Sequence, residues 1–527
     1  MKTFRLFIVL CLALSVWVAF PVSPIYAATV TVSNCNDSGV GSLRQAVADS
    51  TSGDTISFST NCPVSSPITL ATYIDIDKDL TISGTGHDIV LDGNNATRIL
   101  LIQWDKTVTL EYLTLKNGLV LDNRGGGIYD NGSYLTISHV AFDGNRATGI
   151  GADGGAIFHS TNGSLTVLNS TFNGNSAERY GGAICPQVNT TVTDSAFTNN
   201  TAYQGGAYLT ASSGITSTFE RVTMTGNTAI GPGNTLGIGG AILIGDGNLN
   251  IYNSTFSGNG STGYTVYGGA IRADHANVTI KNSTIVNNLV NDGYYGGGLM
   301  TNNSTLSYSN SILANNTGGD CRTDEGLIVA QNTNNLVEVS VGCGTPYRNS
   351  DPILGPLADN GGATRTHALL SGSSAIDEGN DASCLATDQR GISRPQDGNH
   401  DGTPTCDIGA YELNNSAPTD ITLSNAIVPE KQPVGTVIGT LTTTDPDVAD
   451  THTYSFCGGL DDISFQVSGN NLQTNAVFNF ETKASYDICI RTSDGNGGIY
   501  NENFTVNITN IRFPWPMFLP AITKGLK

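Results

Sequence analysis

Residues 154–175 read GGAIFHSTNGSLTVLNSTFNGN, and the pattern of this stretch decides the fold. A Gly-Gly-Ala-Ile element comes first, and an alternation of apolar and polar residues through Leu165, Val167 and Phe172 follows and ends at Asn175. This two-part unit recurs along residues 125–316 at intervals of 24 to 34 residues. Such an interval is too short for an independent domain and fits one turn of a solenoid, whose units bury their apolar sides by stacking.

The repeat predicts an all-β solenoid, a right-handed parallel β-helix. The alternation indicates strands, and Gly and Asn suit tight or left-handed corners. The strands are too closely spaced for crossover helices, which excludes a βαβ fold. The Gly-Gly elements begin at Gly125, Gly154, Gly181, Gly205, Gly239, Gly268 and Gly296. The strand-like parts end at Asn145, Asn175, Asn200, Asn227, Asn259, Asn288 and Asn316.

Each coil of such a helix rises by one strand spacing, about 4.8 Å, so equivalent residues stack on one another. The terminal Asn residues should form a ladder of hydrogen-bonded amides. Because they recur in every coil, we interpret them as structural rather than as a ligand site. A second, apolar column should contain Phe142, Phe172, Phe197, Met224, Phe256, Ile285 and Leu313.

The N-terminal part of the helix is less regular. Strands are expected at residues 80–82, 89–91 and 108–115. The open end of a solenoid needs a cover, since its terminal coil presents unpaired backbone groups. Residues 41–49 suit this task as a helix, with Ser42 as N-cap and one apolar face made of Leu43, Ala46 and Val47. We therefore expect an N-terminal cap at about residues 35–62.

Residues 1–27 have the features of a secretory signal peptide. Lys2 and Arg5 precede an apolar run from Leu6 to Phe20, and Ala27 ends a suitable cleavage site. A membrane anchor is the alternative, but the run has about 15 residues where a spanning helix needs about 20. We expect export, with no transmembrane span in the mature chain and an extracellular or cell-surface location.

The chain is acidic, with a formal net charge of -21, which becomes -23 when residues 1–27 are removed. Nucleic acid is excluded as an expected partner, because phosphate binding requires clustered Lys and Arg. Cysteines that lie near one another in sequence suggest disulfides in an oxidising compartment. The expected pairs are Cys35 with Cys62, Cys321 with Cys343, Cys384 with Cys406, and Cys457 with Cys489. Cys185 is the odd one and is expected to be a buried structural thiol.

These features resemble the bacterial right-handed β-helix proteins of the pectin-lyase-like superfamily, and the repeats resemble those of polymorphic outer-membrane proteins. Residues 350–412 are similar to the choice-of-anchor Q domain. The resemblance rests on LADNGGAT from Leu357, AID from Ala375, DQRG from Asp388, RP from Arg394 and DIGAYE from Asp407. It implies a β-helix domain over residues 28–412 of a surface or secreted protein, with a C-terminal anchor.

Residues 416–511 resemble a cadherin-like domain, a β-sandwich of the immunoglobulin type. The motifs are PE at Pro429, TDPD at Thr444 and TSDG at Thr492, within several short alternating runs. The resemblance implies an adhesion module that binds calcium through oxygen ligands. The matching positions are Glu430, Asp445, Asp447, Glu481 and Asp494, with Asn415 in the linker. The sequence departs from the family at Asn479, where an Asp is usual, and a solvated acidic loop is the alternative.

Two further segments have features of binding or attachment. DGNHDG at 397–402 has the spacing of a calcium loop, but Ile408 stands where a bidentate acid is needed, which favours a polar turn. The apolar tail, residues 512–527, is interrupted by proline and cannot form a membrane helix. It resembles a sorting or attachment signal, which implies a membrane-associated or otherwise anchored protein, and a disordered or packed end is the alternative.

The function expected from the sequence is binding or adhesion, to carbohydrate or to a cell-surface protein. The alternative is a polysaccharide lyase or glycoside hydrolase, because the superfamily contains many. Such chemistry requires paired acids or a metal with a strong base. The weak catalytic candidates are Asp130 and His159 in adjacent coils, and Arg272 and Asp274, beside His275, in one coil. None belongs to a recognisable catalytic motif, so a binding function is favoured.

Overall fold

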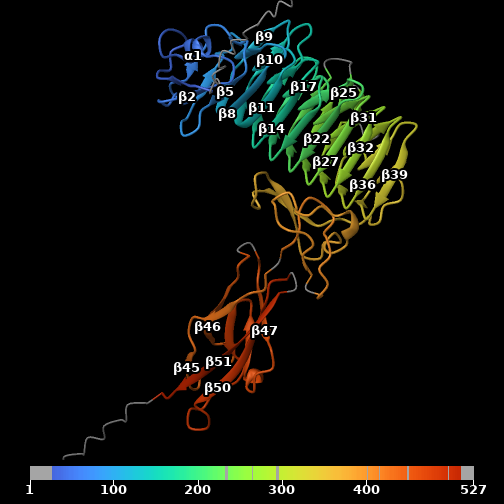
Figure 1. Cartoon of the computed structure of the whole chain (residues 1–527). Coiled ribbons are helices and arrows are strands. Elements are labelled where there is room, and N and C mark those ends of the chain that lie inside the picture. Colours follow the sequence, from blue (N-terminus) through green and yellow to red (C-terminus); the bar gives the residue numbers. More distant parts are fainter. Residues whose placement is uncertain are drawn as a thin grey trace, which may run out of the picture.

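The computed structural model describes residues 27–231, 236–263, 265–291, 296–399, 401–414, 416–447, 450–495 and 498–511. Almost all of the predicted signal peptide and the whole C-terminal tail lie outside the described residues. Figure 1 shows a long body of stacked coils from α1 to β39, then an irregular segment, drawn in orange, and then a separate pair of sheets, drawn in red.

The body of coils is a parallel β-helix, as the repeat predicts. The coils contribute strands to three parallel sheets, whose members pair with the equivalent strands of the coils before and after, and among the described residues the coils at both ends have no strand in the shortest of these sheets. The eleven-stranded sheet consists of β4 (Ile74–Ile76), β7 (Leu100–Ile102), β10 (Ile128–Asp130), β13 (Ile157–His159), β17 (Ile184–Pro186), β21 (Tyr208–Thr210), β26 (Ile242–Gly245), β31 (Ile271–Asp274), β35 (Leu299–Asn302), β38 (Cys321–Thr323) and β41 (Ser340–Val341). The seven-stranded sheet consists of β9 (Leu119–Leu121), β12 (Arg146–Thr148), β16 (Ser176–Ala177), β20 (Thr201–Ala202), β24 (Thr228–Ile230), β29 (Gly260–Thr262) and β34 (Leu289–Val290). A short pair, β25 (Leu236–Ile238) and β30 (Thr265–Tyr267), lies beside it.

The third sheet has 21 strands, and the chain of each coil bends as it crosses this sheet. In two coils a single ten-residue strand spans the bend, and in the later coils a residue such as Asn169, with a positive φ of 47°, divides it into two. The strands before the bend are β1 (Thr29–Val32), β2 (Asp54–Phe58), β5 (Leu80–Ser83), β8 (Thr107–Lys116), β11 (Tyr134–Asp143), β14 (Ser164–Leu168), β18 (Thr190–Thr193), β22 (Thr216–Glu220), β27 (Asn248–Tyr252), β32 (Asn277–Lys281), β36 (Thr305–Ser309) and β39 (Ile328–Thr333). Those after it are β3 (Ile68–Thr69), β6 (Val90–Asp92), β15 (Thr171–Asn173), β19 (Ala196–Thr198), β23 (Thr223–Thr225), β28 (Thr255–Ser257), β33 (Thr284–Val286), β37 (Ile312–Ala314) and β40 (Leu336–Val337).

The predicted apolar column is confirmed. The strand registers place Phe142 beside Phe172, and Phe172 beside Phe197, and continue through Met224, Phe256 and Ile285 to Leu313. All seven side chains are fully buried. The rings of Phe142 and Phe172 stack at 4.7 Å between centroids, and those of Phe172 and Phe197 at 4.6 Å. These spacings equal the separation of neighbouring strands, so ring stacking favours the in-register alignment of successive coils.

The predicted Asn ladder is also confirmed. Asn175 donates from Nδ2 to Oδ1 of Asn200 at 3.0 Å, and Asn200 donates to Oδ1 of Asn227 at 2.9 Å. Each amide also donates to a strand carbonyl, as Asn200 does to Phe172 O at 2.9 Å. The ladder ends at Asp320, whose Oδ1 accepts the Nδ2 hydrogen of Asn316 at 2.8 Å. The amides thus satisfy the buried backbone at a corner that all coils share.

The two glycines of the repeat have different reasons to lack a side chain. Gly154, the first, has φ of +67°, a left-handed conformation that L side chains rarely adopt. Gly182, a second-position glycine, has ordinary φ, but a Cβ there would lie 2.1 Å from the carbonyl oxygen of Gly206 in the next coil. The corner therefore closes because the backbones of successive coils approach one another directly.

The N-terminal end carries the predicted helix, α1 (Leu43–Asp49). Ser42 is its N-cap and accepts the N–H of Gln45 at 3.2 Å. Leu43, Ala46 and Val47 are buried and belong to the same hydrophobic cluster as the coils.

Residues 350–412 lie against the side of the coils and do not add further ones. They form a short antiparallel pair, β42 (Leu354–Ala358) and β43 (Thr366–Leu369), a 3₁₀ turn η1 (Asp381–Ser383) and long loops. Leu369, Ala375 and Ile408 share a hydrophobic cluster with outward-facing residues of β33, β37 and β40. We call residues 350–412 the lateral segment. It buries an apolar strip that the coils would otherwise expose.

The chain ends in two four-stranded sheets with a hydrophobic cluster of their own. One contains β44 (Asp420–Leu423), β46 (Val437–Thr444), β49 (Asn471–Thr474) and β48 (Phe465–Ser468), and the turn η2 (Asp462–Ser464) precedes β48. The other contains β45 (Ile427–Pro429), β51 (Ile499–Thr509), β50 (Ser485–Ser493) and β47 (Thr453–Phe456). Residues of both sheets, such as Leu472 and Ile490, are fully buried in the shared cluster.

The four predicted disulfides are all present: Cys35–Cys62, Cys321–Cys343, Cys384–Cys406 and Cys457–Cys489. Cys185 is free and buried, as expected. Its burial, with the carboxylate of Asp153 as a smaller cause, raises the pKa of the thiol well above its ordinary value. The thiol therefore stays protonated at neutral pH, and the thiol is a weaker nucleophile than the thiolate.

Candidate functional site

Asp130 and His159 come together inside the helix. Both are fully buried, since alternation along β10 and β13 turns them toward the interior. The distance between Asp130 Oδ2 and His159 Nε2 is 3.2 Å. Asp130 also accepts the N–H groups of Gly132 and Ser133 at 2.9 Å and the Ser133 hydroxyl at 2.6 Å. Their geometry therefore closes the turn after β10 and offers no atom to a substrate outside.

Arg272 and Asp274 form an ion pair on the outer side of β31. Arg272 donates from Nε to Asp274 Oδ1 at 2.9 Å and from Nη1 to Asp324 Oδ2 at 2.7 Å. Only 7% of Arg272 is exposed, and its guanidinium lies over the ring of Tyr267. His275, at the end of the same strand, has a positive φ of 52° and occupies a corner. The arrangement links coils that are two apart, since β35 lies between β31 and β38, and it does not place two carboxylates around an open space.

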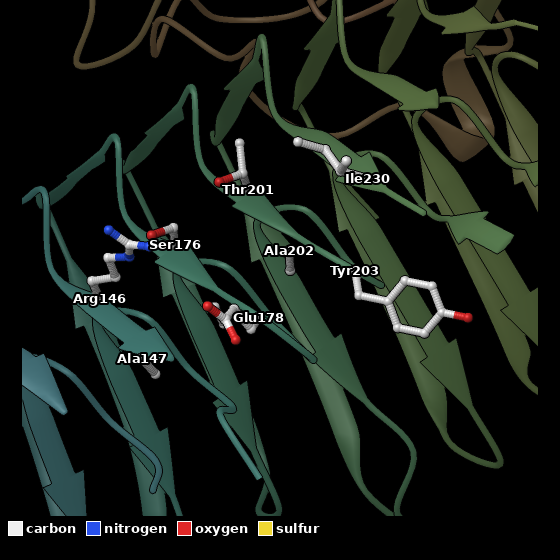
Figure 2. Close-up of a pocket in the computed structure, with 9 residues that line it drawn as sticks. Arg146, Ala147, Ser176, Glu178, Thr201, Ala202, Tyr203 and Ile230 are labelled. Carbon is white, nitrogen blue, oxygen red and sulfur yellow. The ribbon is translucent and has the colours of Figure 1, made fainter. Parts of the chain in front are cut away.

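A shallow depression lies on the exposed face of the seven-stranded sheet. It has a volume of about 350 Å³ and is lined by side chains of β12, β16, β20 and β24 and of the residues that directly follow them. Figure 2 shows Arg146, Ser176 and Thr201 at equivalent positions of successive strands, with Glu178 and Tyr203 further along. Glu178 accepts the N–H of Gly149 at 2.8 Å. These residues carry no motif that the sequence alone could reveal, because each side chain occurs in one coil among otherwise similar ones.

The residues proposed for calcium do not lie together. Asp445 and Asp494 lie near one end of the C-terminal sheets, where their carboxylates and that of Asp450 are within 4.8 Å of one another. Asp447 is adjacent: its N–H donates to Asp445 Oδ1 at 2.8 Å, and its Oδ2 accepts the N–H of Ser416 at 2.6 Å. The family motif does not include Asp450, although the acidic run DPDVAD, which contains Asp445 and Asp447, extends to it. Asn415 lies outside the described residues.

Glu430 and Glu481 lie at the opposite end. The nine residues of β50 lie between Glu481 and Asp494 in the chain, and they span about 30 Å at the rise of an extended strand. Glu430 is 1% exposed and accepts the N–H of Ile511 at 3.1 Å, which holds the pKa of its carboxyl below the ordinary value. Glu481 accepts from the Asn510 amide at 2.6 Å. These two acids therefore belong to a different place from the aspartates.

The loop at residues 397–402 is a polar turn. Both oxygens of Asp397 accept backbone hydrogens, from Asp401 at 3.1 Å and from Gly402 at 3.0 Å. Asp401 in turn accepts the N–H of Thr403. The carboxylates stabilise the turn, in agreement with the interpretation favoured from sequence.

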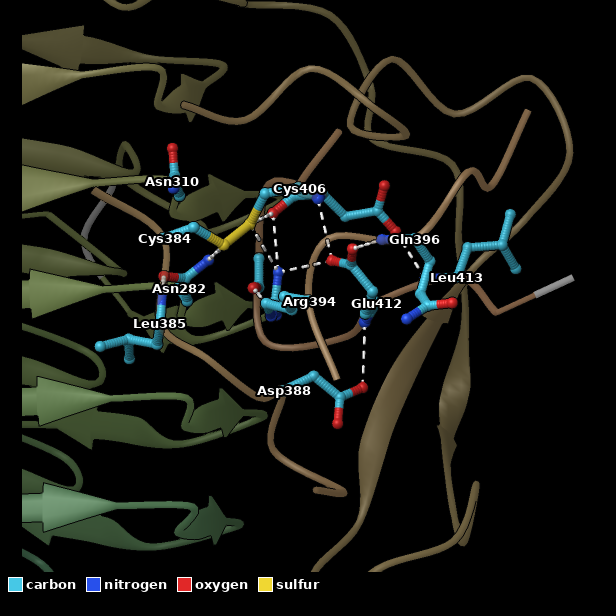
Figure 3. A network of polar contacts seen from close by, with 12 residues as sticks. Asn282, Asn310, Cys384, Leu385, Asp388, Arg394, Gln396, Cys406, Glu412 and Leu413 are labelled. Atoms are coloured by element: carbon cyan, nitrogen blue, oxygen red, sulfur yellow. Dashed lines mark hydrogen bonds and ion pairs between the residues drawn. A yellow bond between two sulfur atoms is a disulfide. The ribbon is translucent and has the colours of Figure 1, made fainter. Parts of the chain in front are cut away.

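The motif residues of the lateral segment form a buried ionic network, drawn in Figure 3. Arg394 Nη1 lies 2.8 Å from Glu412 Oε2, and the N–H of Glu412 donates to Asp388 Oδ2 at 3.0 Å. Burial raises the pKa of Glu412 and lowers that of Arg394. The Cys384–Cys406 disulfide lies beside this network, in contact with Asn282 of the coils. The network orders the lateral segment and its contact with the coils.

One comparison with protein families agrees with this fold. A family model described as the right handed beta helix region matches residues 77–238. The body of coils is a right-handed parallel β-helix. No curated protein matches the chain, whereas 30 chains of solved structures do. One is the crystal structure of pectate lyase Pel9A, at 13% identity and a TM-score of 0.33, over 74% of this chain and 98% of the lyase.

None of the helices among the described residues is long and apolar enough to cross a bilayer.

Proposed function

We propose that the protein is an exported binding protein, which acts at the cell surface through its β-helix and a C-terminal adhesion module. The observation that carries this proposal is the enclosure of Asp130 and His159, whose polar atoms are occupied inside the coil. Glycoside hydrolysis requires two carboxyl groups on either side of an accessible bond. The depression on the seven-stranded sheet instead exposes one carboxylate, Glu178, among hydroxyl, aromatic and guanidinium groups, as binding sites do.

The proposal predicts that the purified full chain binds intact bacterial cells or isolated cell walls saturably and does not degrade polysaccharides. Incubation with a panel of neutral and acidic polysaccharides should leave the amounts of reducing and unsaturated ends unchanged. Turnover that Asp130→Ala or Asp274→Ala abolishes would overturn the binding function and establish a lyase or hydrolase.

Export and attachment are part of the same proposal. The signal-like residues 1–27, the choice-of-anchor Q resemblance of the lateral segment and the apolar tail support it. The four disulfides support an oxidising compartment. Mass spectrometry of the cell-wall and culture fractions should find an N-terminal peptide that begins at residue 28. Retention of the uncleaved chain inside the cell would contradict export.

The C-terminal sheets are proposed to be a cadherin-like sandwich that holds calcium at Asp445, Asp450 and Asp494. These residues fit a calcium ion, because three carboxylates within 4.8 Å of one another supply the oxygen ligands that a hard cation prefers. Bound calcium would neutralise their mutual repulsion and join the loops that follow β46 and β50.

Calcium should therefore raise the melting temperature of the full chain, and a chelator should lower it. Asp494→Asn should remove this difference. The matched control is Glu481→Gln, an acid at the opposite end of β50, which should keep the difference. A melting temperature that calcium does not change would remove the metal from the proposal.

A further inference from the structure

The depression on the seven-stranded sheet runs along the axis of the helix. Arg146 pairs in register with Ser176, Ser176 with Thr201, and Thr201 with Thr228. Three steps of one strand spacing give a length of about 14 Å. Side chains two residues further along these strands lie on the same face, because residues alternate between faces. These are Glu178, Tyr203 and Ile230, so the depression has two parallel rows of side chains.

Side-chain size explains the hollow. In one row the short Ser176, Thr201 and Thr228 follow the longer, exposed Arg146. In the other row Ile230, which is 47% exposed, follows Tyr203. The corresponding position is Leu119 in the coil before Arg146. Leu289 occupies it at the far end of the sheet. The combination of short and polar side chains is therefore local to these coils and is not a consequence of the repeat.

The lining supplies the groups that a sugar ring requires. Tyr203 offers a partly exposed ring face for an apolar C–H surface. A sugar hydroxyl both donates and accepts hydrogen bonds. Arg146 is a donor only, Glu178 is an acceptor only, and the hydroxyls of Ser176 and Thr201 do both. Among the described residues Arg146 has no ion pair within 4.0 Å, so its donors are available to a ligand.

Two other classes of ligand fit less well. An extended peptide binds by adding to a free sheet edge, but β12, β16, β20 and β24 are each paired on both sides. A polyanion, whether nucleic acid or an acidic glycan, would meet a chain of net charge -21 and the carboxylate of Glu178 in the depression. A volume of about 350 Å³ lies at the lower end of small-molecule sites, about 300–1,000 Å³.

We propose that this depression binds a short neutral glycan, which lies along the helix axis with one ring against Tyr203. This inference rests on the proposed binding function and adds the ligand class and the residues that recognise it. Glu178 and Arg146 orient the hydroxyl groups, and Ser176 and Thr201 allow the rings to approach the sheet closely.

The test is isothermal titration calorimetry of the full chain with three neutral probes, maltopentaose, cellopentaose and xylopentaose, and one acidic probe, trigalacturonate. At least one neutral probe should bind, and trigalacturonate should bind more weakly. Tyr203→Ala and Glu178→Gln should each reduce the affinity for that probe at least tenfold, with an unchanged melting temperature. The matched control is Tyr134→Ala, which removes a tyrosine that is 54% exposed on another sheet.

The inference is overturned if no neutral probe binds, if trigalacturonate binds more tightly, or if both depression variants bind like the wild type. The cell-binding assay separates this failure from that of the proposed function. Saturable binding to cells that Tyr203→Ala leaves unchanged would retain the function and reject this site. Loss of binding to every cell and wall preparation would reject the function itself.

Discussion

At the level of single residues, the buried amides of the Asn ladder stabilise the coils, because each makes several hydrogen bonds. Asn200 donates to Phe172 O and to Asn227 Oδ1, and its Oδ1 accepts from both N and Nδ2 of Asn175. A buried group that loses its partner costs about 1–3 kcal/mol. One substitution in the ladder leaves several such groups in two neighbouring coils.

Asn200→Ala should therefore lower the midpoint of thermal unfolding by several degrees, and the free energy of unfolding by at least about 3 kcal/mol. The matched control is Asn173→Ala, which removes an exposed amide in the preceding coil whose partner is Asp143. It should change the midpoint little. Circular dichroism melts of both variants measure the midpoints. Equal midpoints would contradict a contribution of the Asn ladder to stability.

At the level of elements, the contact between the lateral segment and the coils contains a titratable group. His367, in β43, is 5% exposed, and its ring nitrogens lie 2.7 Å from Gly355 O and 2.9 Å from Ser257 Oγ of β28. Burial lowers the pKa of this histidine, with the Gly355 hydrogen bond as a smaller opposing cause. The unfolded chain, with a pKa of 6.5, therefore takes up a proton before the folded chain does.

This difference in proton uptake decides whether the stability rises or falls with pH. The free energy of unfolding gains a contribution from His367 that is complete above pH of about 6.5 and is lost as the pH falls through the folded pKa. Acidification from neutral pH should loosen the lateral segment, seen as an increase in the hydrogen exchange of β42 and β43 relative to the intrinsic exchange rate at each pH. His367→Gln should show a smaller increase over the same range. An equal increase in both proteins would assign the effect to other groups.

At the level of the whole molecule, the chain has two separate main cores. The cluster around Phe172 contains residues of the coils and α1, whereas the cluster around Leu472 contains residues of the two C-terminal sheets. Large-to-small substitutions in a core typically cost 2–5 kcal/mol. Because no buried residue belongs to both clusters, the cost should remain within one body.

Differential scanning calorimetry should therefore resolve two transitions. Phe172→Ala should lower one midpoint and Leu472→Ala the other, each with no effect on its counterpart. A single transition that both variants shift would show that the bodies unfold together.

The sequence by itself determined the repeating part of the protein: the coil period, the apolar column through Phe172, the Asn ladder and the disulfide partners. The physical reason is that these features are local, since a period of one coil fixes which residues stack once the strands pair. A short sequence separation likewise favours each cysteine pair, as for Cys35 and Cys62.

Only the tertiary structure decided which face a polar residue occupies and which distant segments meet. Asp130 and His159 share a phase in the sequence, but the structure turns both inward. Asp494 and Glu481 match one family motif set, but a full strand separates them. The depression near Tyr203 arises from side-chain sizes in neighbouring coils, and the lateral segment meets residues more than 100 positions away, as Gln389 meets Thr255. Such contacts depend on the shape of assembled surfaces, which no local period encodes.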